Sequence, residues 1–353
     1  MSLTKIVRIN PLNPEVRYLQ EAVDILESGG LVIIPTETVY GIAADALNQK
    51  AVERLAEIKK RAKDKPFTIA IERREKIDEL AREVPVAAYK LIDKFWPGPL
   101  TLILKGINQS TIGLRMPDNK IALQVIAGVG KPLVLPSANL SGSPAPENFE
   151  AAIRDLNGLV DLAIDSGALK FGIESTIVDL TAEIPQVIRL GAINDEEINK
   201  AIVRKNILFV CTGNTCRSVI AETLFKKMMR DNQRFDVEVF SAGVMTLSGI
   251  GASQSTKDIL AREGINASGH VAREVTREML QKSDLILVME RLHEEAVLKL
   301  APEVKNRVFL LKEFARIDEN NLDIVDPMGK SMDFYEKTFA SIKEALERVS
   351  KLI

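Results

Sequence analysis

The chain has 353 residues, of which 46% are hydrophobic and 27% charged; this length predicts two domains, and the composition excludes a disordered chain. A formal net charge of −2 argues against a nonspecific nucleic-acid binder, but this net charge does not exclude a local basic cleft. The two cysteines, Cys211 and Cys216, form no disulfide framework. No signal-peptide core or membrane-length apolar run occurs, so a cytoplasmic protein without membrane partners is expected.

The first half of the chain alternates helical and strand-like patterns. A helix is predicted from residue 13 to about residue 28, ended by Gly29-Gly30. Residues 1–191 are therefore expected to form a mixed α/β domain, followed by a charged helical linker at 192–204. A further helix is predicted at 51–60, and strands are predicted at 31–34, 67–71, 101–104, 112–116, 132–135, 177–180 and 187–190.

A second and more regular alternation occupies residues 205–353. Regular βα alternation predicts a doubly wound, four-stranded parallel sheet with right-handed crossovers. The expected strands are 207–210, 237–241, 284–288 and 307–310, and the expected helices include 217–229 and 333–352.

The sharpest local pattern is Cys-Thr-Gly-Asn-Thr-Cys-Arg-Ser at residues 211–218. Cys211 ends a buried strand and Arg217 opens a helix. Between them lies a short loop whose amides can turn around an anion. These groups also favour a thiolate, and the guanidinium can grip a phosphate bidentately. The pattern predicts a cysteine nucleophile that attacks phosphorus; the alternatives are a buried strand-end thiol and a loop that only binds anions. The phosphate-binding loop comprises Thr212, Gly213, Asn214, Thr215, Cys216 and Ser218.

A general acid is needed to protonate the leaving group. Asp326 follows the last strand, where the active sites of α/β sheets gather. The alternative role for this residue is a turn former before Pro327.

Residues 205–353 resemble the low-molecular-weight protein phosphatases in the loop 211–218, in Asp326-Pro327 and in the strand end 241–243. The resemblance implies that Cys211 is the nucleophile, that Arg217 is the phosphate clamp and that Asp326 is the acid. Asn214 and Ser218 would support the loop and the thiolate, and no cofactor would be needed. Val219 replaces a proline that is frequent in the family, which should cost rigidity more than chemistry.

Two phosphoprotein substrates are compatible with this resemblance. Thr215 and the pair Met328-Gly329 resemble the protein-arginine phosphatases of the family, and phosphotyrosine is the alternative. An arsenate reductase is disfavoured, because no cysteine follows Cys216. Cys216 either forms a reversible disulfide with Cys211 under oxidation or is an ordinary loop residue.

Several stretches of the first half are rich in groups suited to a nucleotide and a small polar acid. Lys59 and Arg61 lie at a predicted helix end, and hydroxyl, amide and arginine side chains lie at the ends of predicted strands. Each is weak alone, since Lys59 could be a solvated helix end and Thr36 an ordinary strand-end hydroxyl. Neither Walker nor Rossmann glycine spacing is present. The candidates that follow strands are Thr36, Ser137 and Asn139; Arg115 and Arg189 end strands, and Ser175 precedes one.

Taken together, these stretches resemble the YrdC/Sua5 family. The matching motifs are residues 35–41, Lys59-x-Arg61, residues 96–99, Ser137-x-Asn139 and Ser175-Thr176, in that order. The resemblance implies a twisted mixed α/β sheet and synthesis of threonylcarbamoyl-AMP from threonine, bicarbonate or CO2, and ATP with Mg2+. It implies threonine binding by Thr36, Arg115 and Ser175. It implies ATP binding by Lys59, Arg61, Thr111, Ser137, Asn139 and Arg189.

The resemblance also implies partners in the t6A modification of tRNA, and no metal held by the protein itself. Ala62 stands where family members often have proline, so a looser loop is expected. Longer members carry a different C-terminal domain and a linker that covers the nucleotide; the phosphatase-like segment is expected to replace them here, so residues 191–204 are the candidate cover. The alternative hypothesis is that the first domain is a non-catalytic RNA-binding module.

Overall fold

The computed structural model describes residues 3–60, 66–247, 249–317 and 320–353. It divides into two compact units, Met1–Ala201 and Ile202–Ile353. Helix α7 (Asp195–Val203) lies within the segment 192–204 that was expected to connect two domains. Among the described residues, no helix combines the length and the apolar character needed to cross a bilayer.

A mixed sheet of ten strands forms the first unit, which confirms the expected sheet type. Strand β8 pairs in parallel with both β1 and β2, whereas β3 pairs antiparallel with β2 and β7. The spatial order is β1-β8-β2-β3-β7-β4-β6-β5-β9-β10. The strands are β1 (Lys5–Arg8), β2 (Val32–Ile34), β3 (Gly41–Asp45), β4 (Ile69–Ala70), β5 (Leu100–Lys105), β6 (Thr111–Arg115), β7 (Leu133–Val134), β8 (Leu162–Asp165), β9 (Thr176–Asp179) and β10 (Gln186–Arg189).

Helix α1 supplies much of the first unit's core. Leu19, Ala22, Val23 and Leu26 lie on one face of the helix at helical spacing, and all are buried. This helix packs against α5 and against strands β2 and β3. The helices are α1 (Val16–Glu27), α2 (Gln49–Ile58), α3 (Lys76–Leu80), α4 (Val86–Phe95), α5 (Lys120–Val129) and α6 (Phe149–Arg154).

The second unit contains a four-stranded, entirely parallel sheet, as the βα alternation predicted. The spatial order is β12-β11-β13-β14, so β11 lies in the interior of the sheet. The strands are β11 (Lys205–Cys211), β12 (Val237–Gly243), β13 (Leu285–Val288) and β14 (Val308–Leu310).

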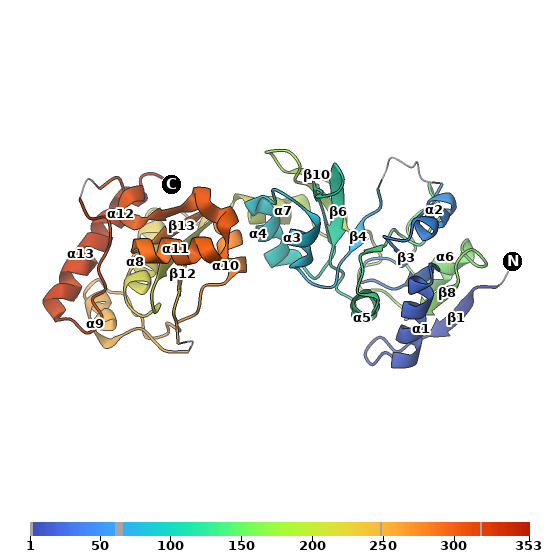
Figure 1. Ribbon diagram of the computed structural model, residues 1–353, viewed down its shortest axis with the longest axis horizontal. Helices are drawn as coiled ribbons and strands as arrows, with labels where there is room; N and C mark the ends of the chain where they lie inside the picture. The colour runs from blue at the N-terminus through green and yellow to red at the C-terminus, as the bar shows by residue number, and fades with distance from the viewer. Residues whose placement is uncertain (1–2, 61–65, 248, 318–319) are drawn as a thin grey trace. The chain divides into compact units, whose positions relative to one another are not determined.

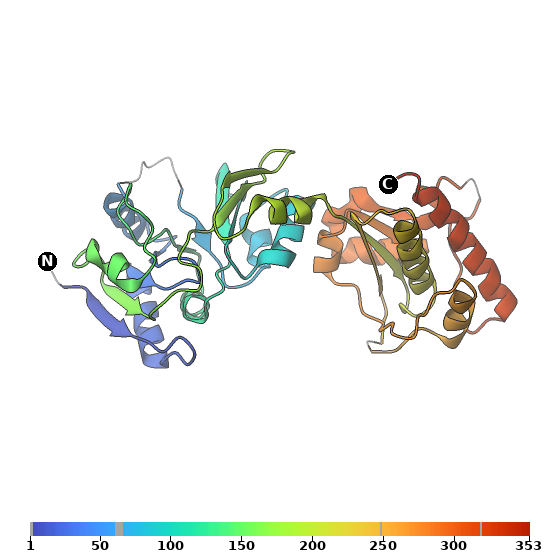
Figure 2. The same cartoon turned by 180° about the vertical axis from the view of Figure 1, so that it is seen from behind.

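Both faces of this second sheet are covered by helices (Figures 1 and 2). Phe209 and Cys211 pack into the core that α8 and α13 cover. Leu208 and Val210, which point the other way because strand side chains alternate, pack with α11. The helices are α8 (Arg217–Asp231), α9 (Gln254–Arg262), α10 (Arg277–Gln281), α11 (Arg291–Leu300), α12 (Leu311–Phe314) and α13 (Met332–Val349), with a 3-10 turn at Pro302–Arg307.

Candidate active sites

A cavity of about 300 Å³ in the first unit gathers most of the candidate residues. Thr111 is not among its lining residues, because it starts β6 whereas Arg115 ends that strand. Arg61 lies outside the described residues. The candidates that line the cavity are Thr36, Lys59, Arg115, Ser137, Asn139, Ser175 and Arg189, and its apolar lining includes Val39, Phe67, Leu135, Pro136 and Ile177.

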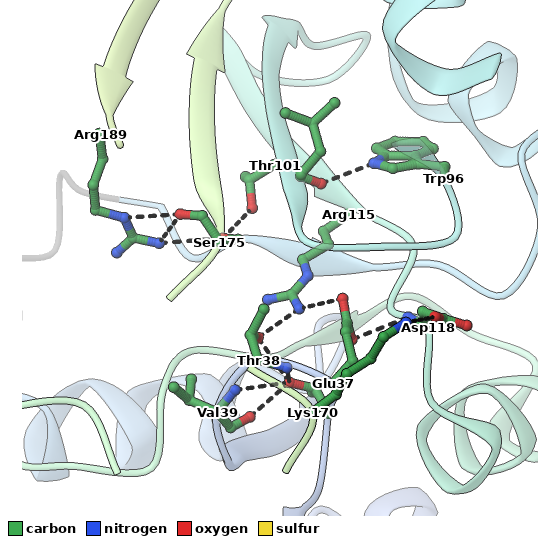
Figure 3. A network of polar contacts seen from close by, with 12 residues as sticks. Glu37, Thr38, Val39, Trp96, Thr101, Arg115, Asp118, Lys170, Ser175 and Arg189 are labelled. Carbon is green, nitrogen blue, oxygen red and sulfur yellow. Dashed lines mark hydrogen bonds and ion pairs between the residues drawn. The ribbon is translucent and has the colours of Figure 1, made fainter. Parts of the chain in front are cut away.

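Arg115 is anchored by a buried ion pair that the sequence did not indicate (Figure 3). Its Nη2 donates to Glu37 Oε1 at 2.8 Å and to Thr38 Oγ1 at 2.6 Å. The second carboxylate oxygen of Glu37 accepts from the Asp118 amide at 3.0 Å. Arg115 Nε is buried and has no hydrogen-bond partner in the described part of the chain. An anionic substrate group can satisfy this donor.

The hydroxyl of Thr36 is engaged within its own turn. It donates to the Val39 carbonyl at 2.6 Å and accepts from the amides of Thr38 and Val39, each at 3.2 Å. Such hydroxyl-to-backbone bonds stabilise tight turns. Thr36 therefore shapes the cavity wall, and a direct bond to a substrate would have to replace one of these contacts.

Ser175 and Arg189 form another polar wall of the cavity (Figure 3). Arg189 Nη2 donates to Ser175 O at 2.9 Å and to Ser175 Oγ at 3.2 Å. Its Nη1 donates to Glu174 Oε1 at 2.6 Å. Thr101, which the sequence indicated only as the start of a strand, places its hydroxyl 2.9 Å from that of Ser175. The wall thus presents hydroxyl groups beside a guanidinium.

Lys59 organises the polar turn that contains the Ser-x-Asn motif. Its ammonium donates to Ser137 O at 2.8 Å, to Asn139 O at 2.7 Å and to Asn139 Oδ1 at 2.8 Å. An ammonium has three N–H donors, and these contacts direct it at both ends of the 137–139 turn. Lys59 thus brings its charge beneath the turn and orders the turn at the same time.

The first unit's cavity does not suit a protein-held metal ion. Among the residues that the structure describes, no group of three or more His, Cys, Asp and Glu side chains gathers around a common point. Glu174 and Glu37 are each paired with an arginine. The donor set therefore does not fit Mg2+, and such an ion would have to arrive on the phosphates of a nucleotide.

In the second unit, Cys211 lies buried at the end of β11, with its Sγ 3.0 Å from Ser218 Oγ. Asn214 adopts the left-handed conformation, with φ 51°. Its Nδ2 donates to Ser218 Oγ at 2.9 Å and to Ser241 Oγ at 2.7 Å. The loop then enters α8 at Arg217. The structure therefore places a thiol, a fixed hydroxyl and a helix N-terminus together, as an anion site requires.

Arg217 is the centre of this second site. Its side chain is 1% exposed. Nη1 donates to Glu290 Oε2 at 2.6 Å, and Nη2 donates to Asp326 Oδ2 at 2.6 Å and to Thr212 Oγ1 at 3.1 Å. Its Nε is buried without a hydrogen-bond partner in the described residues. The candidate clamp and the candidate acid are thus in contact, and the guanidinium retains a donor for an anion.

The two histidines of the chain both contact this loop, although no motif singled them out. His270 Nε2 donates to the Asn214 carbonyl at 2.8 Å. His293 is fully buried, with Nε2 2.9 Å from Thr212 Oγ1. Burial, and after it the positive charge of Arg217, lower the pKa of His293 to about 4. The only available signal in the sequence was the rarity of histidine.

Cys216 is buried beside two hydroxyl groups. Its Sγ lies 3.3 Å from Ser253 Oγ and 3.3 Å from Tyr335 Oη. Burial, together with the contact to Cys216, raises the pKa of Tyr335 to about 12. Both cysteines are free, so reversible pairing of Cys211 with Cys216 stays a prediction.

The two halves of the chain match two different protein families. Residues 24–191 match the Sua5/YciO/YrdC family, described as telomere recombination. Residues 206–353 match the low molecular weight phosphotyrosine protein phosphatases.

Individual relatives follow the same division. A threonylcarbamoyl-AMP synthase of Pyrococcus abyssi is 41% identical over 51% of this chain and 56% of that protein. A putative threonylcarbamoyl-AMP synthase of Mycobacterium tuberculosis is 36% identical over 53% of this chain and 89% of that protein. A solved structure of an arginine phosphatase from Geobacillus stearothermophilus is 34% identical in sequence. The match covers 42% of this chain and 92% of that protein's chain, with a TM-score of 0.38. The chain thus spans about half the length of the Pyrococcus relative.

Proposed function

Because the chain belongs to the Sua5/YciO/YrdC family through residues 24–191 and carries a low-molecular-weight phosphatase domain in residues 206–353, we propose that it is a bifunctional enzyme. The first activity makes threonylcarbamoyl-AMP from threonine, bicarbonate or CO2, and ATP, with release of pyrophosphate. The second hydrolyses a phosphorylated protein. Each activity is assigned to the unit that contains its site.

The cavity of the first unit supports the synthase because it combines Lys59, Arg115 and Arg189 with several hydroxyls. Threonine's amine and bicarbonate form an N-carboxylate and water. The N-carboxylate oxygen attacks the α-phosphorus of ATP, and the bond to pyrophosphate breaks. Negative charge develops on phosphate oxygens, and preorganised cations stabilise it. Mg2+ would enter only as part of the ATP substrate, because the described cavity residues provide no ligand set for it.

The threonine end of the cavity is assigned to Arg115, whose buried Nε lacks an acceptor. Ser175 and the shape of the Thr36 turn complete that end. The nucleotide end is assigned to Arg189 and to the turn that Lys59 holds, with Ser137, Asn139 and, from the resemblance, Arg61 and Thr111. No side chain needs to form a covalent intermediate.

The synthase is tested by threonine- and bicarbonate-dependent ATP–pyrophosphate exchange with the full chain. We expect Arg115→Ala to lower kcat/KM for threonine about 100-fold, because it removes a charge-assisted contact to the substrate carboxylate. Arg8→Ala is the control, since the Arg8 side chain is 84% exposed on β1. Folded wild-type protein without exchange would defeat the synthase and favour the RNA-binding alternative.

Further along the reaction sequence, the product is proposed to serve the t6A modification of tRNA. The acyl adenylate is a mixed anhydride, and a second enzyme must transfer its threonylcarbamoyl group to an amine. We place the protein, its tRNA and the proteins of that modification in the cytoplasm.

The phosphatase proposal rests on Cys211, which lies 3.0 Å from Ser218 Oγ at the head of α8. The thiolate attacks phosphorus, the bond to the leaving group breaks, and Asp326 supplies the proton. Water then attacks the phosphocysteine, which releases phosphate and restores the thiolate. Arg217 stabilises the transferring phosphoryl group through its unsatisfied Nε.

We propose phosphoarginine as the substrate in preference to phosphotyrosine. The loops at 244–251 and 325–331 contain no aromatic residue that could clamp a phenyl ring. Thr215, in the phosphate loop, offers a hydroxyl where an apolar contact would suit an aromatic substrate. A higher kcat/KM for a phosphotyrosine peptide than for a phosphoarginine peptide would reverse this assignment.

Cys211→Ser tests the nucleophile. We expect hydrolysis of p-nitrophenyl phosphate to fall by more than about 1,000-fold, because the serine hydroxyl is not ionised near neutrality. Circular dichroism checks that the fold is kept, and ATP–pyrophosphate exchange by the same variant is the internal control. Residual wild-type turnover in this variant would contradict the assignment.

A further inference from the structure

The proton on His293 has a defined position. Nδ1 lies 3.1 Å from the Glu290 backbone amide, and an amide N–H can only donate. Nδ1 is therefore an acceptor without a proton, so the neutral ring carries its proton on Nε2. That nitrogen lies 2.9 Å from Thr212 Oγ1, to which it must donate. The depressed pKa of His293 agrees with a neutral ring.

The hydroxyl of Thr212 then receives two hydrogen bonds. One comes from His293 Nε2 and the other from Arg217 Nη2 at 3.1 Å. A hydroxyl oxygen has two lone pairs and one proton. With both lone pairs engaged, the Thr212 hydroxyl can act towards any further group only as a donor.

This directed hydroxyl lies beside the groups that handle phosphate. Thr212 follows Cys211 directly in the loop, and its side chain is only partly buried. Arg217 Nη2 contacts Thr212 Oγ1 and Asp326 Oδ2 together. Phosphoryl oxygens are strong acceptors, and a hydrogen bond to a charged acceptor is among the stronger ones in proteins.

We propose that His293 is a positioning residue of the phosphatase site, which directs the proton of the Thr212 hydroxyl onto an oxygen of the bound phosphoryl group. Arg217 assists by occupying the second lone pair. The inference rests on the proposed phosphatase activity. It adds a phosphate donor beyond the loop amides and Arg217, and it gives the buried histidine a function other than packing.

The test compares Thr212→Val, which has nearly the same shape but no hydroxyl, with Thr212→Ser, which keeps it. Kinetics with p-nitrophenyl phosphate are measured on the full chain. We expect Thr212→Val to lower kcat/KM about tenfold, the effect of losing one hydrogen bond to a charged group. Thr212→Ser should lose far less.

His293 is tested by a double-mutant cycle. We expect His293→Leu to lower kcat/KM about as much as Thr212→Val, and the double variant to lose no more than either single variant, because both remove the same contact. His293→Gln, whose amide can both donate and accept, should recover part of the loss. The proposal would be overturned if the loss of kcat/KM in the double variant equalled the product of the two single losses. A Thr212→Val variant with wild-type kcat/KM would overturn it as well.

A binding measurement separates this inference from the phosphatase itself. Tungstate, a tetrahedral oxyanion, is titrated calorimetrically into Cys211→Ser with and without Thr212→Val. We expect about tenfold weaker binding in the double variant. Unchanged tungstate affinity refutes the role of the hydroxyl whether or not the wild type is active. If the wild type hydrolyses no phosphate ester while the double variant binds tungstate more weakly than Cys211→Ser, the phosphatase proposal is wrong. The role of the Thr212 hydroxyl as an anion donor then still holds.

Discussion

At the scale of single residues, His293 shows how burial and charge change a side chain that no motif identifies. Its ring is fully buried and faces Arg217, Glu290, Asp323 and Asp326. Burial and the guanidinium together lower its pKa from 6.5 to about 4. In the unfolded chain the same imidazole is exposed to water and has its ordinary pKa.

This difference predicts a pH-dependent stability of the second unit. Between pH 6.5 and about 4 the unfolded chain binds more protons at His293 than the folded chain, so stability falls as the pH falls through that window. The contribution is up to about 3 kcal/mol. It is measured by urea unfolding at pH 7 and pH 4.5, followed by hydrogen exchange in peptides from residues 205–231. His293→Gln should show a shallower loss, and equal losses in the two proteins would refute the prediction.

At the scale of elements, the end of β12 lies directly against the phosphate loop. A Cβ on Gly243 would lie 2.5 Å from the Thr212 carbonyl oxygen and 2.9 Å from the Asn214 amide nitrogen. Both are backbone atoms, which cannot rotate away as a flexible side chain could. The parallel pairing of Cys211 with Gly243 creates this close approach. Glycine is therefore required by space, not by an unusual dihedral angle.

Gly243→Ala is predicted to displace the phosphate loop. We expect a loss of about 1–3 kcal/mol in stability from overpacking, and a fall of at least about tenfold in phosphatase kcat/KM, because small displacements of reacting groups are costly. Gly269→Ala serves as control, since a Cβ there meets nothing within 4 Å. Unaltered kinetics in Gly243→Ala would show that the loop tolerates the shift.

At the scale of the whole molecule, each unit has its own hydrophobic core. One core cluster of the first unit is built from residues between Val7 and Ile164. The two cores of the second unit are built from residues between Ile207 and Val349. Every group assigned to the phosphatase comes from the second unit. The two chemistries are therefore expected to be separable.

A fragment of residues 202–353 is predicted to fold alone and to keep most of the phosphatase kcat/KM of the full chain. The physical reason is that its sheet is covered on both faces by its own helices. Circular dichroism and hydrolysis of p-nitrophenyl phosphate check this. A folded fragment with little activity would show that the first unit contributes to the phosphatase.

Local features of the chain were readable from the sequence. The loop at 211–218 is one continuous segment, so its nucleophile, its arginine and its helix start follow from spacing alone. The strands of the second unit were predicted because their residues are apolar and β-branched. The strands β1, β3 and β8 were not predicted. For β3 the reason is its sequence Gly-Ile-Ala-Ala-Asp, in which small residues with low strand preference dominate.

The sequence by itself determined the two fold classes, the loop that carries Cys211 and the polar stretches that follow strands, because these depend on periodicity and short spacing. Only the tertiary structure decided that Glu37 holds Arg115, that Lys59 engages the 137–139 turn and that Thr111 stays out of the cavity. It likewise decided that both histidines contact the phosphate loop. These partners lie far apart in the chain, and sheet pairing, which no local pattern encodes, brings them together.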